Sequence, residues 1–458
     1  MFGLFAPTCP LGTWEKTWTE RRMLWLADKF GLDRLKSARV VLPTDEFFPD
    51  RYDADTPSAR RCFDRVCGYM GVDPASLHMN VVPDAMLPDA AGMYGERERT
   101  IWIAASQLTD PARLIAVIAH ELAHELLIRG GCLPWDGDGN AAARAVVRRG
   151  GRLSPDMNDH EEVTDLLPVF LGTGVFLANA TIVSRSGYEG GWSWWSVGRS
   201  GYLSSFVLGY GLALFAFARG ETKPAWAKYL RPDARGTMLS ALRYLTRTGD
   251  TLFTPDAAAA GPRLATVPVL VERMGHASAT RRLSALWDVT EQPRDKPEVL
   301  AAIRRCLDDR DEAVLAAAAL AAAALGDAAD EAVPRVVELT EWDAPEVRSA
   351  AVRALGRLRT RADEAVPALV ARLTDKHPDV GSAAAEALAA YRFAARPAVP
   401  KVLEALERSL VKGDLRVSSL VGVLMVLDPD PEARLRDHFR RDEDQMRSAL
   451  MVLREFAE

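Results

Sequence analysis

Residues 115–128 read IAVIAHELAHELLI, and this run places His120 and His124 four positions apart among apolar residues. The dipeptide Asp110-Pro111 just before the run is a helix-start signal. In a helix, residues four apart lie on one face, one turn above each other. Two imidazoles in that arrangement can bind one metal ion. The run therefore predicts a helix that carries two zinc ligands.

A third zinc ligand is expected from a carboxylate on the next predicted helix, because no other histidine occurs between His124 and His160. That helix offers Glu161, Glu162 and Asp165. Glu161 and Asp165 are four positions apart, so their carboxylates face the same way. The two helices together predict a site with two imidazoles and one carboxylate.

The motif H-E-x-x-H at 120–124, followed by E-x-x-x-D at 161–165, resembles the gluzincin metallopeptidases over about residues 112–180. This resemblance implies a zincin-like catalytic domain with a Zn²⁺ ion held by His120, His124 and Glu161. It makes Asp165 the acceptor that orients a ligand histidine. Glu162 is the alternative third ligand, and His160 is a further one.

The same resemblance implies catalytic roles for two more residues. Glu121 lies beside the metal face and is expected to act as the general base for zinc-activated water. Tyr202 is expected to stabilise the oxyanion. The other candidates for that role are Tyr188, Arg199 and Tyr210. The substrate is expected to be a protein or peptide that pairs in an extended conformation with the predicted strand at 100–104.

The C-terminal part of the chain repeats with a period of 33 residues. Two kinds of residue recur at this spacing: Pro334, Pro367 and Pro400, and Val314, Val347 and Val380. A fixed period of predicted helix pairs is typical of a solenoid. Residues 265–458 resemble HEAT repeats of the short kind found in phycobilin-lyase-like proteins. The resemblance implies an arm that binds a protein partner, either the substrate or a regulator.

The predicted fold class is an α+β zincin-like metallopeptidase domain followed by an all-α HEAT-like solenoid. The first domain is expected over residues 1–255, with a mixed α/β part at 1–110 and a helical catalytic part at 111–250. The repeats are expected over 256–458. The boundary is placed in the stretch 249–262, which is rich in glycine, proline and alanine.

Charge and cysteine content bear on nucleic-acid binding and on the compartment of the protein. Among the 458 residues the net charge is −6, so no bulk attraction to nucleic acid is expected. Five scattered cysteines and an N-terminus without a signal-peptide pattern predict a cytoplasmic protein. The uncharged stretches 166–183 and 203–218 are expected to be buried helices, and membrane insertion is the alternative.

The sequence thus predicts a zinc-dependent endopeptidase whose HEAT-like repeats recruit a substrate or a regulator. One alternative is a scaffold in which zinc is structural or regulatory and the repeats carry the function. Another is a zinc hydrolase that acts on non-peptide amides.

Overall fold

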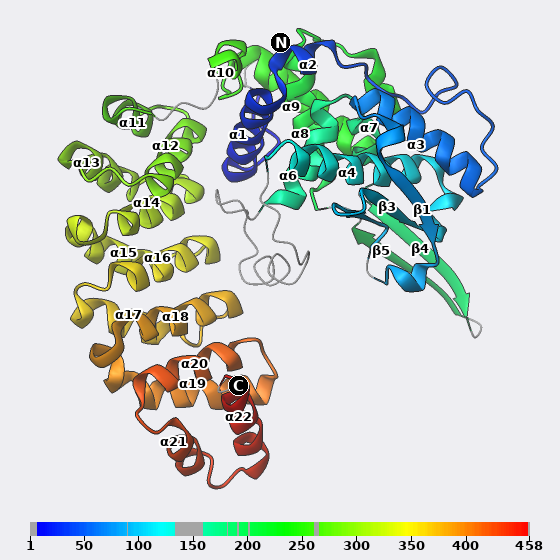
Figure 1. Cartoon of the computed structure of the whole chain (residues 1–458). Helices are drawn as coiled ribbons and strands as arrows, with labels where there is room; N and C mark the ends of the chain where they lie inside the picture. Colours follow the sequence, from blue (N-terminus) through cyan, green and yellow to red (C-terminus); the bar gives the residue numbers. More distant parts are fainter. Residues whose placement is uncertain are drawn as a thin grey trace. The chain divides into compact units, whose positions relative to one another are not determined.

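The computed structural model describes most of the chain (Figure 1). The described residues are 7–88, 90–132, 159–180, 182–189, 192–199, 202–260 and 265–456, and side chains are described for all of these except 182–189, 192–199 and 259–260. The chain divides into two compact units, Met1–Arg263 and Leu264–Glu458. The sequence had placed the boundary after residue 255.

The first unit is mostly helical. Its helices are α1 (Thr13–Phe30), α2 (Leu32–Ser37), α3 (Thr56–Met70), α4 (Pro111–Arg129), α6 (His160–Phe170), α7 (Gly174–Ala180), α8 (Ser205–Ala218), α9 (Pro232–Thr248) and α10 (Pro255–Ala260). Short 3-10 helices lie at Pro74–Ser76, Asp84–Met86, Ala105–Thr109 and Ala225–Tyr229. Its strands are β1 (His78–Val82), β2 (Gly92–Gly95), β3 (Thr100–Ala104), β4 (Ile182–Glu189) and β5 (Trp192–Arg199).

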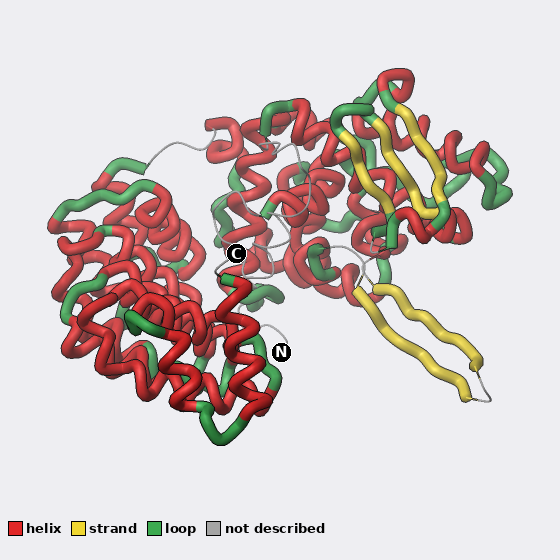
Figure 2. Tube along the Cα trace, turned by 60° about the horizontal axis from the view of Figure 1, so that its bottom comes forward, coloured by secondary structure: helices red, strands yellow, loops and turns green. Residues whose placement is uncertain are grey.

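The strands form one small sheet and one hairpin (Figure 2). The sheet has the order β1-β3-β2, and β3 is parallel to β1 and antiparallel to β2. The central strand β3 is apolar and mostly buried, and both β2 and β3 pack against α4. Strands β4 and β5 pair antiparallel as a separate two-stranded ribbon. The sheet therefore supports the helix that carries the two histidines.

The prediction of an α+β first domain is wrong for the part of the chain that the structure describes. The predicted strand at 100–104 exists as β3, but β1 and β3 are only five residues long each. Most of the core consists instead of apolar faces of helices, including Trp18, Phe63, Phe170 and Phe215. Three short strands bury too little surface to organise a unit of this size, so helix packing determines the fold.

The two uncharged stretches form short buried helices. The first is broken between α6 and α7 at Gly172, which has a positive φ of 92°. A side chain there would collide with the carbonyl oxygen of Arg39. The second stretch forms α8, which is buried on nearly all sides and packs against α1, α6 and α9. No helix among the described residues is long and apolar enough to cross a membrane.

The second unit is a stack of helix pairs. Its helices are α11 (Val267–Met274), α12 (Ala279–Glu291), α13 (Pro297–Cys306), α14 (Glu312–Ala324), α15 (Val333–Leu339), α16 (Pro345–Leu358), α17 (Ala362–Arg372), α18 (Pro378–Tyr391), α19 (Val399–Lys412), α20 (Arg416–Leu427), α21 (Pro431–His438) and α22 (Glu443–Glu455). Short 3-10 helices lie at Gly326–Ala332 and Arg392–Ala398.

Two features of the sequence explain this stacking. Helices α12, α14, α16, α18 and α20 form one row in which each helix packs against the next (Figure 1). Alanine and glycine allow the close approach, because a Cβ on Gly356 would lie 2.8 Å from Ala387 of the neighbouring helix. Successive repeats are also joined by a buried ion pair between Arg348 and Asp375, 2.8 Å apart. The predicted solenoid of helix pairs is present.

Candidate metal centre

Helix α4 presents His120 and His124 on one face. The helix begins at Pro111, and the Asp110 side chain caps it by accepting hydrogen bonds from the N–H groups of Ala112 and Arg113. Apolar residues on the other faces are buried, which fixes the rotation of the helix about its axis. The two imidazole rings lie one turn apart, with their centroids separated by 4.9 Å.

Helix α6 brings a carboxylate to the two imidazoles. One oxygen of Glu161, Oε2, lies 3.4 Å from the Nε2 atom of His120 and 3.4 Å from that of His124. The three donor atoms all lie within 4.8 Å of one another, and the side chains are partly buried. The structure therefore brings Glu161 together with the two histidines.

The electrostatics of this cluster follow from the short contacts. Burial by itself raises the pKa of Glu161, but hydrogen bonds to His120, His124 and His160 outweigh it and lower the pKa well below its usual range. Burial lowers the pKa of His120, whereas the contacts with Asp165 and Glu161 raise it more strongly. These contacts thus keep the Glu161 carboxylate ionised.

Asp165 lies where the sequence places it, behind His120. Its Oδ1 atom is 2.8 Å from Nδ1 of His120, and its Oδ2 atom accepts hydrogen bonds from the N–H groups of Tyr202 and Leu203. This contact occupies Nδ1 of His120 and orients the imidazole ring. The other nitrogen, Nε2, is then the one available to a metal ion.

These donors suit Zn²⁺. Two imidazole nitrogens and one carboxylate oxygen are a common zinc ligand set, and a carboxylate behind one histidine is its usual support. The neighbouring His160 is near the same cluster, since its Nε2 atom lies 3.0 Å from Oε1 of Glu161. Among the described residues, the gathered donor set contains Glu161 and not the alternative ligand Glu162.

Glu121 lies beside the cluster and is buried. The backbone N–H of Tyr94 on β2 donates to its carboxylate, and burial raises its pKa. Strand β2 passes so close that a Cβ on Gly92 would lie 2.8 Å from Oε1 of Glu121. The general-base role predicted for Glu121 depended on the peptidase interpretation, and the position of the side chain does not test it.

The candidate oxyanion residues have different locations. The ring of Tyr202 stacks on His120, with centroids 6.0 Å apart, and is 54% exposed. Tyr210 is buried in the core, where its hydroxyl donates to Glu20. Tyr188 and Arg199 belong to β4 and β5, and their side chains lie outside the described residues. Of these residues, the structure thus places Tyr202 next to the cluster.

Sequence reasoning missed three residues that hold the start of α6. Asp159 precedes the helix, and its buried carboxylate accepts hydrogen bonds from Trp18 and Arg22 on α1. An aspartate before a predicted helix is expected to be an N-cap, so its local sequence gave no sign of this contact. The partners are more than 130 positions away in sequence, which no periodicity can reveal.

Comparisons with known proteins identify helical repeats. The family model for HEAT repeats matches residues 333–421. A designed armadillo repeat protein is 18% identical, and the match covers 41% of this chain and 99% of that chain with a TM-score of 0.31. An engineered protein is 12% identical, with 95% of this chain and 98% of that chain covered at a TM-score of 0.30.

A structure of the karyopherin Kap121p bound to the SUMO protease Ulp1p is also similar. It is 12% identical, and the match covers 95% of this chain and 52% of that chain at a TM-score of 0.32. The comparison with curated proteins finds no match.

These findings correct the peptidase interpretation. The family model that matches is that of HEAT repeats, over residues 333–421, and the first unit is built mostly from packed helices. The resemblance to gluzincins, the zincin-like domain and the endopeptidase activity are therefore wrong as predictions for this chain. The physical reason is that H-E-x-x-H fixes side chains on one helix and specifies nothing of the surrounding fold. The prediction of HEAT repeats is confirmed over residues 333–421.

Proposed function

We propose that this chain is a zinc-binding scaffold protein that acts through its HEAT-like repeats. The repeats bind a protein partner, and a zinc ion held by His120, His124 and Glu161 fastens α4 to α6 in the first unit. Zinc supplies a cross-link at this position, because ion binding adds directly to the stability of the fold that assembles its ligands. The protein works in a reducing compartment such as the cytoplasm, which the five free cysteines support.

The observation that carries the zinc site is the gathering of three donor atoms within 4.8 Å from two helices that are separate in sequence. The support from Asp165 adds to it, since this carboxylate fixes the orientation of one imidazole.

The repeats support the scaffold role. Solenoids of stacked helix pairs present extended surfaces and act mainly by binding. On the row formed by α12, α14, α16, α18 and α20, charged side chains remain partly or fully exposed, including Arg353, Arg357 and Glu386. These residues offer a polar surface on adjacent helices to a partner protein.

The partner role is tested with the full chain as bait in cells that express it. Proteins recovered with the wild type are compared with those recovered with the double variant Arg357→Glu, Glu386→Lys, and with a chain that ends at Arg263. We expect at least one protein whose recovery is lost with the truncated chain and reduced at least about tenfold with the double variant. Equal recovery of every protein with all three baits contradicts the scaffold role.

A further inference from the structure

The start of helix α6 is held by a buried contact with α1. We propose that Trp18 and Arg22, acting through Asp159, are positioning residues that place Glu161 for metal binding. This inference rests on the proposed zinc site. It assigns a role to three side chains that are not themselves metal ligands.

The contact is specific in its geometry. Nε1 of Trp18 donates to Oδ2 of Asp159 at 2.5 Å. Arg22 donates from Nε to the same oxygen at 2.7 Å and from Nη2 to Oδ1 at 3.1 Å. Trp18 is 2% exposed and Asp159 is 4% exposed. A two-pronged arginine–carboxylate pair in a buried setting fixes direction as well as distance.

The side chain of Asp159 does not cap helix α6, although the residue stands at the N-cap position. An aspartate directly before a helix normally caps the first turn by accepting hydrogen bonds from the helix N–H groups. The Asp159 side chain makes no such bond, although its backbone carbonyl accepts the first helical hydrogen bond from Val163. Its carboxylate is aimed at α1 instead, so α1 controls the orientation of the first turn of α6.

The first turn of α6 carries the proposed metal ligand Glu161. Glu161 lies two residues after Asp159, within the same helical turn. The two histidines, in contrast, lie on α4, which has its own cap and its own buried face. Loss of the anchor should therefore displace Glu161 while His120 and His124 stay in place.

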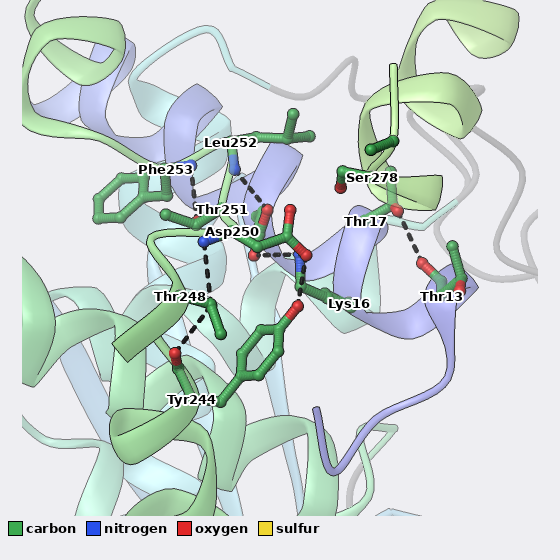
Figure 3. Close-up of polar contacts among 12 residues, drawn as sticks. Thr13, Lys16, Thr17, Tyr244, Thr248, Asp250, Thr251, Leu252, Phe253 and Ser278 are labelled. Atoms are coloured by element: carbon green, nitrogen blue, oxygen red, sulfur yellow. Dashed lines mark hydrogen bonds and ion pairs between the residues drawn. The ribbon is translucent and has the colours of Figure 1, made fainter. Parts of the chain in front are cut away.

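The opposite face of α1 is held by a second network, which does not include Asp159. Lys16 and Glu20 lie about half a helical turn from Trp18 and Arg22, so they project from the other side of the helix. Lys16 pairs with Glu20 at 3.1 Å and with Asp250 at 3.6 Å. Figure 3 shows Lys16 beside Asp250 and Tyr244.

Glu20 extends the network on that face. It accepts hydrogen bonds from the hydroxyl of Tyr210 and from the N–H of Leu252. These contacts hold α1 to α8 and to the segment after α9. Helix α1 is thus a fixed support that cannot follow α6 if the Asp159 contact is lost.

The test measures zinc affinity of the full chain by competition with a chelating dye. The variants are Asp159→Asn, Arg22→Gln and Trp18→Phe, and the control is Arg60→Gln, which removes an exposed ion pair with Asp64 on α3. We expect Asp159→Asn and Arg22→Gln to lower zinc affinity about 10- to 100-fold, the usual effect of lost outer support. Trp18→Phe, which removes one donor and keeps the apolar ring, should have a smaller effect in the same direction.

A cobalt spectrum separates positioning from simple stability. Co²⁺ in the wild-type site should show visible bands that weaken or shift in Asp159→Asn, because one ligand has moved, and that are unchanged in Arg60→Gln. A merely structural contact would lower the melting temperature and leave the bands and the affinity unchanged, and that outcome overturns the inference. If Asp159→Asn does not fold, Trp18→Phe with wild-type affinity and spectrum overturns it equally.

Failure of this inference is distinguishable from failure of the zinc site. A wild-type chain that binds neither Zn²⁺ nor Co²⁺ contradicts the proposed site. A wild type that binds, a Glu161→Ala variant that binds weakly, and anchor variants that bind like the wild type contradict the positioning role alone.

Discussion

Asp165 serves three donors at once, and its substitution separates metal support from metal ligation. In Asp165→Asn, the amide cannot accept hydrogen bonds from both His120 Nδ1 and the two backbone N–H groups, because one side of it is now a donor. We expect zinc to remain bound with about 10- to 100-fold lower affinity. Chelator competition measures this change. Complete loss of zinc would instead identify Asp165 as a direct ligand.

Glu162 makes the metal-free fold sensitive to pH. Burial raises its pKa from 4.5 to about 7, helped by the nearby carboxylates, and its Oε2 atom has no hydrogen-bond partner among the described residues. A carboxyl whose pKa is raised on folding stabilises the fold below its unfolded pKa. That contribution is lost as pH rises through about 7. Melting temperature should therefore fall between pH 5 and pH 8.

Glu162→Gln is the test of this pH effect. In chelator-treated protein, the variant should lose part of the fall in melting temperature between pH 5 and pH 8. Its advantage over the wild type should appear at pH 8 and be smallest at pH 5. A variant whose melting temperature runs parallel to that of the wild type across this range contradicts the assignment to Glu162.

The sequence predicted the relative positions of those metal-centre residues that share one helix. The spacing of His120 and His124, and of Glu161 and Asp165, follows from the helical period alone. That the two pairs meet was expected from a resemblance and not from physics. The contact of Asp159 with Trp18 and the hydrogen bond from Tyr202 N–H to Asp165 depend on tertiary packing, so no local pattern contained them.

Two helical glycines test how tightly the elements pack. A Cβ on Gly356 of α16 would lie 2.8 Å from the backbone of Ala387 on α18, whereas a Cβ on the exposed Gly236 of α9 meets nothing within 4 Å. Gly356→Ala should destabilise the second unit by about 1–3 kcal/mol through overpacking. Gly236→Ala should stabilise the first unit by up to about 1 kcal/mol through helix propensity.

Denaturant unfolding measures both glycine variants. Equal effects of the two substitutions would show that the close approach of α16 and α18 does not limit packing.

For the helices of the second unit, the sequence predicted such stacking from its 33-residue period. It did not predict the break between α6 and α7, because the collision that requires Gly172 is with Arg39, far away in sequence.

At the scale of the whole molecule, the two units should fold separately. Each has its own buried core, and the division falls between Arg263 and Leu264. A chain that ends at Arg263 should melt cooperatively and bind zinc with the affinity of the full chain, because every proposed ligand and anchor lies within it. An unfolded fragment, or one that has lost zinc affinity, would show that the repeats support the metal centre.

The predicted fold class was wrong because it was taken from a local motif. A five-residue motif and a second helix carry four side chains that the structure brings together. The same motif was extended to a whole catalytic domain, which the helical content and the comparisons do not support. Ligand spacing is a local property, whereas the class of a fold depends on how all elements bury their apolar faces.

Metal analysis of the purified full chain tests whether His120, His124 and Glu161 hold a zinc ion. Wild-type protein prepared without chelators should contain one zinc ion per chain, and His124→Ala should contain none while keeping its helical content. His276→Ala is the matched control, because this histidine lies in the second unit, and it should retain the full amount. A wild type that holds no stoichiometric zinc even after exposure to excess Zn²⁺ would contradict the account.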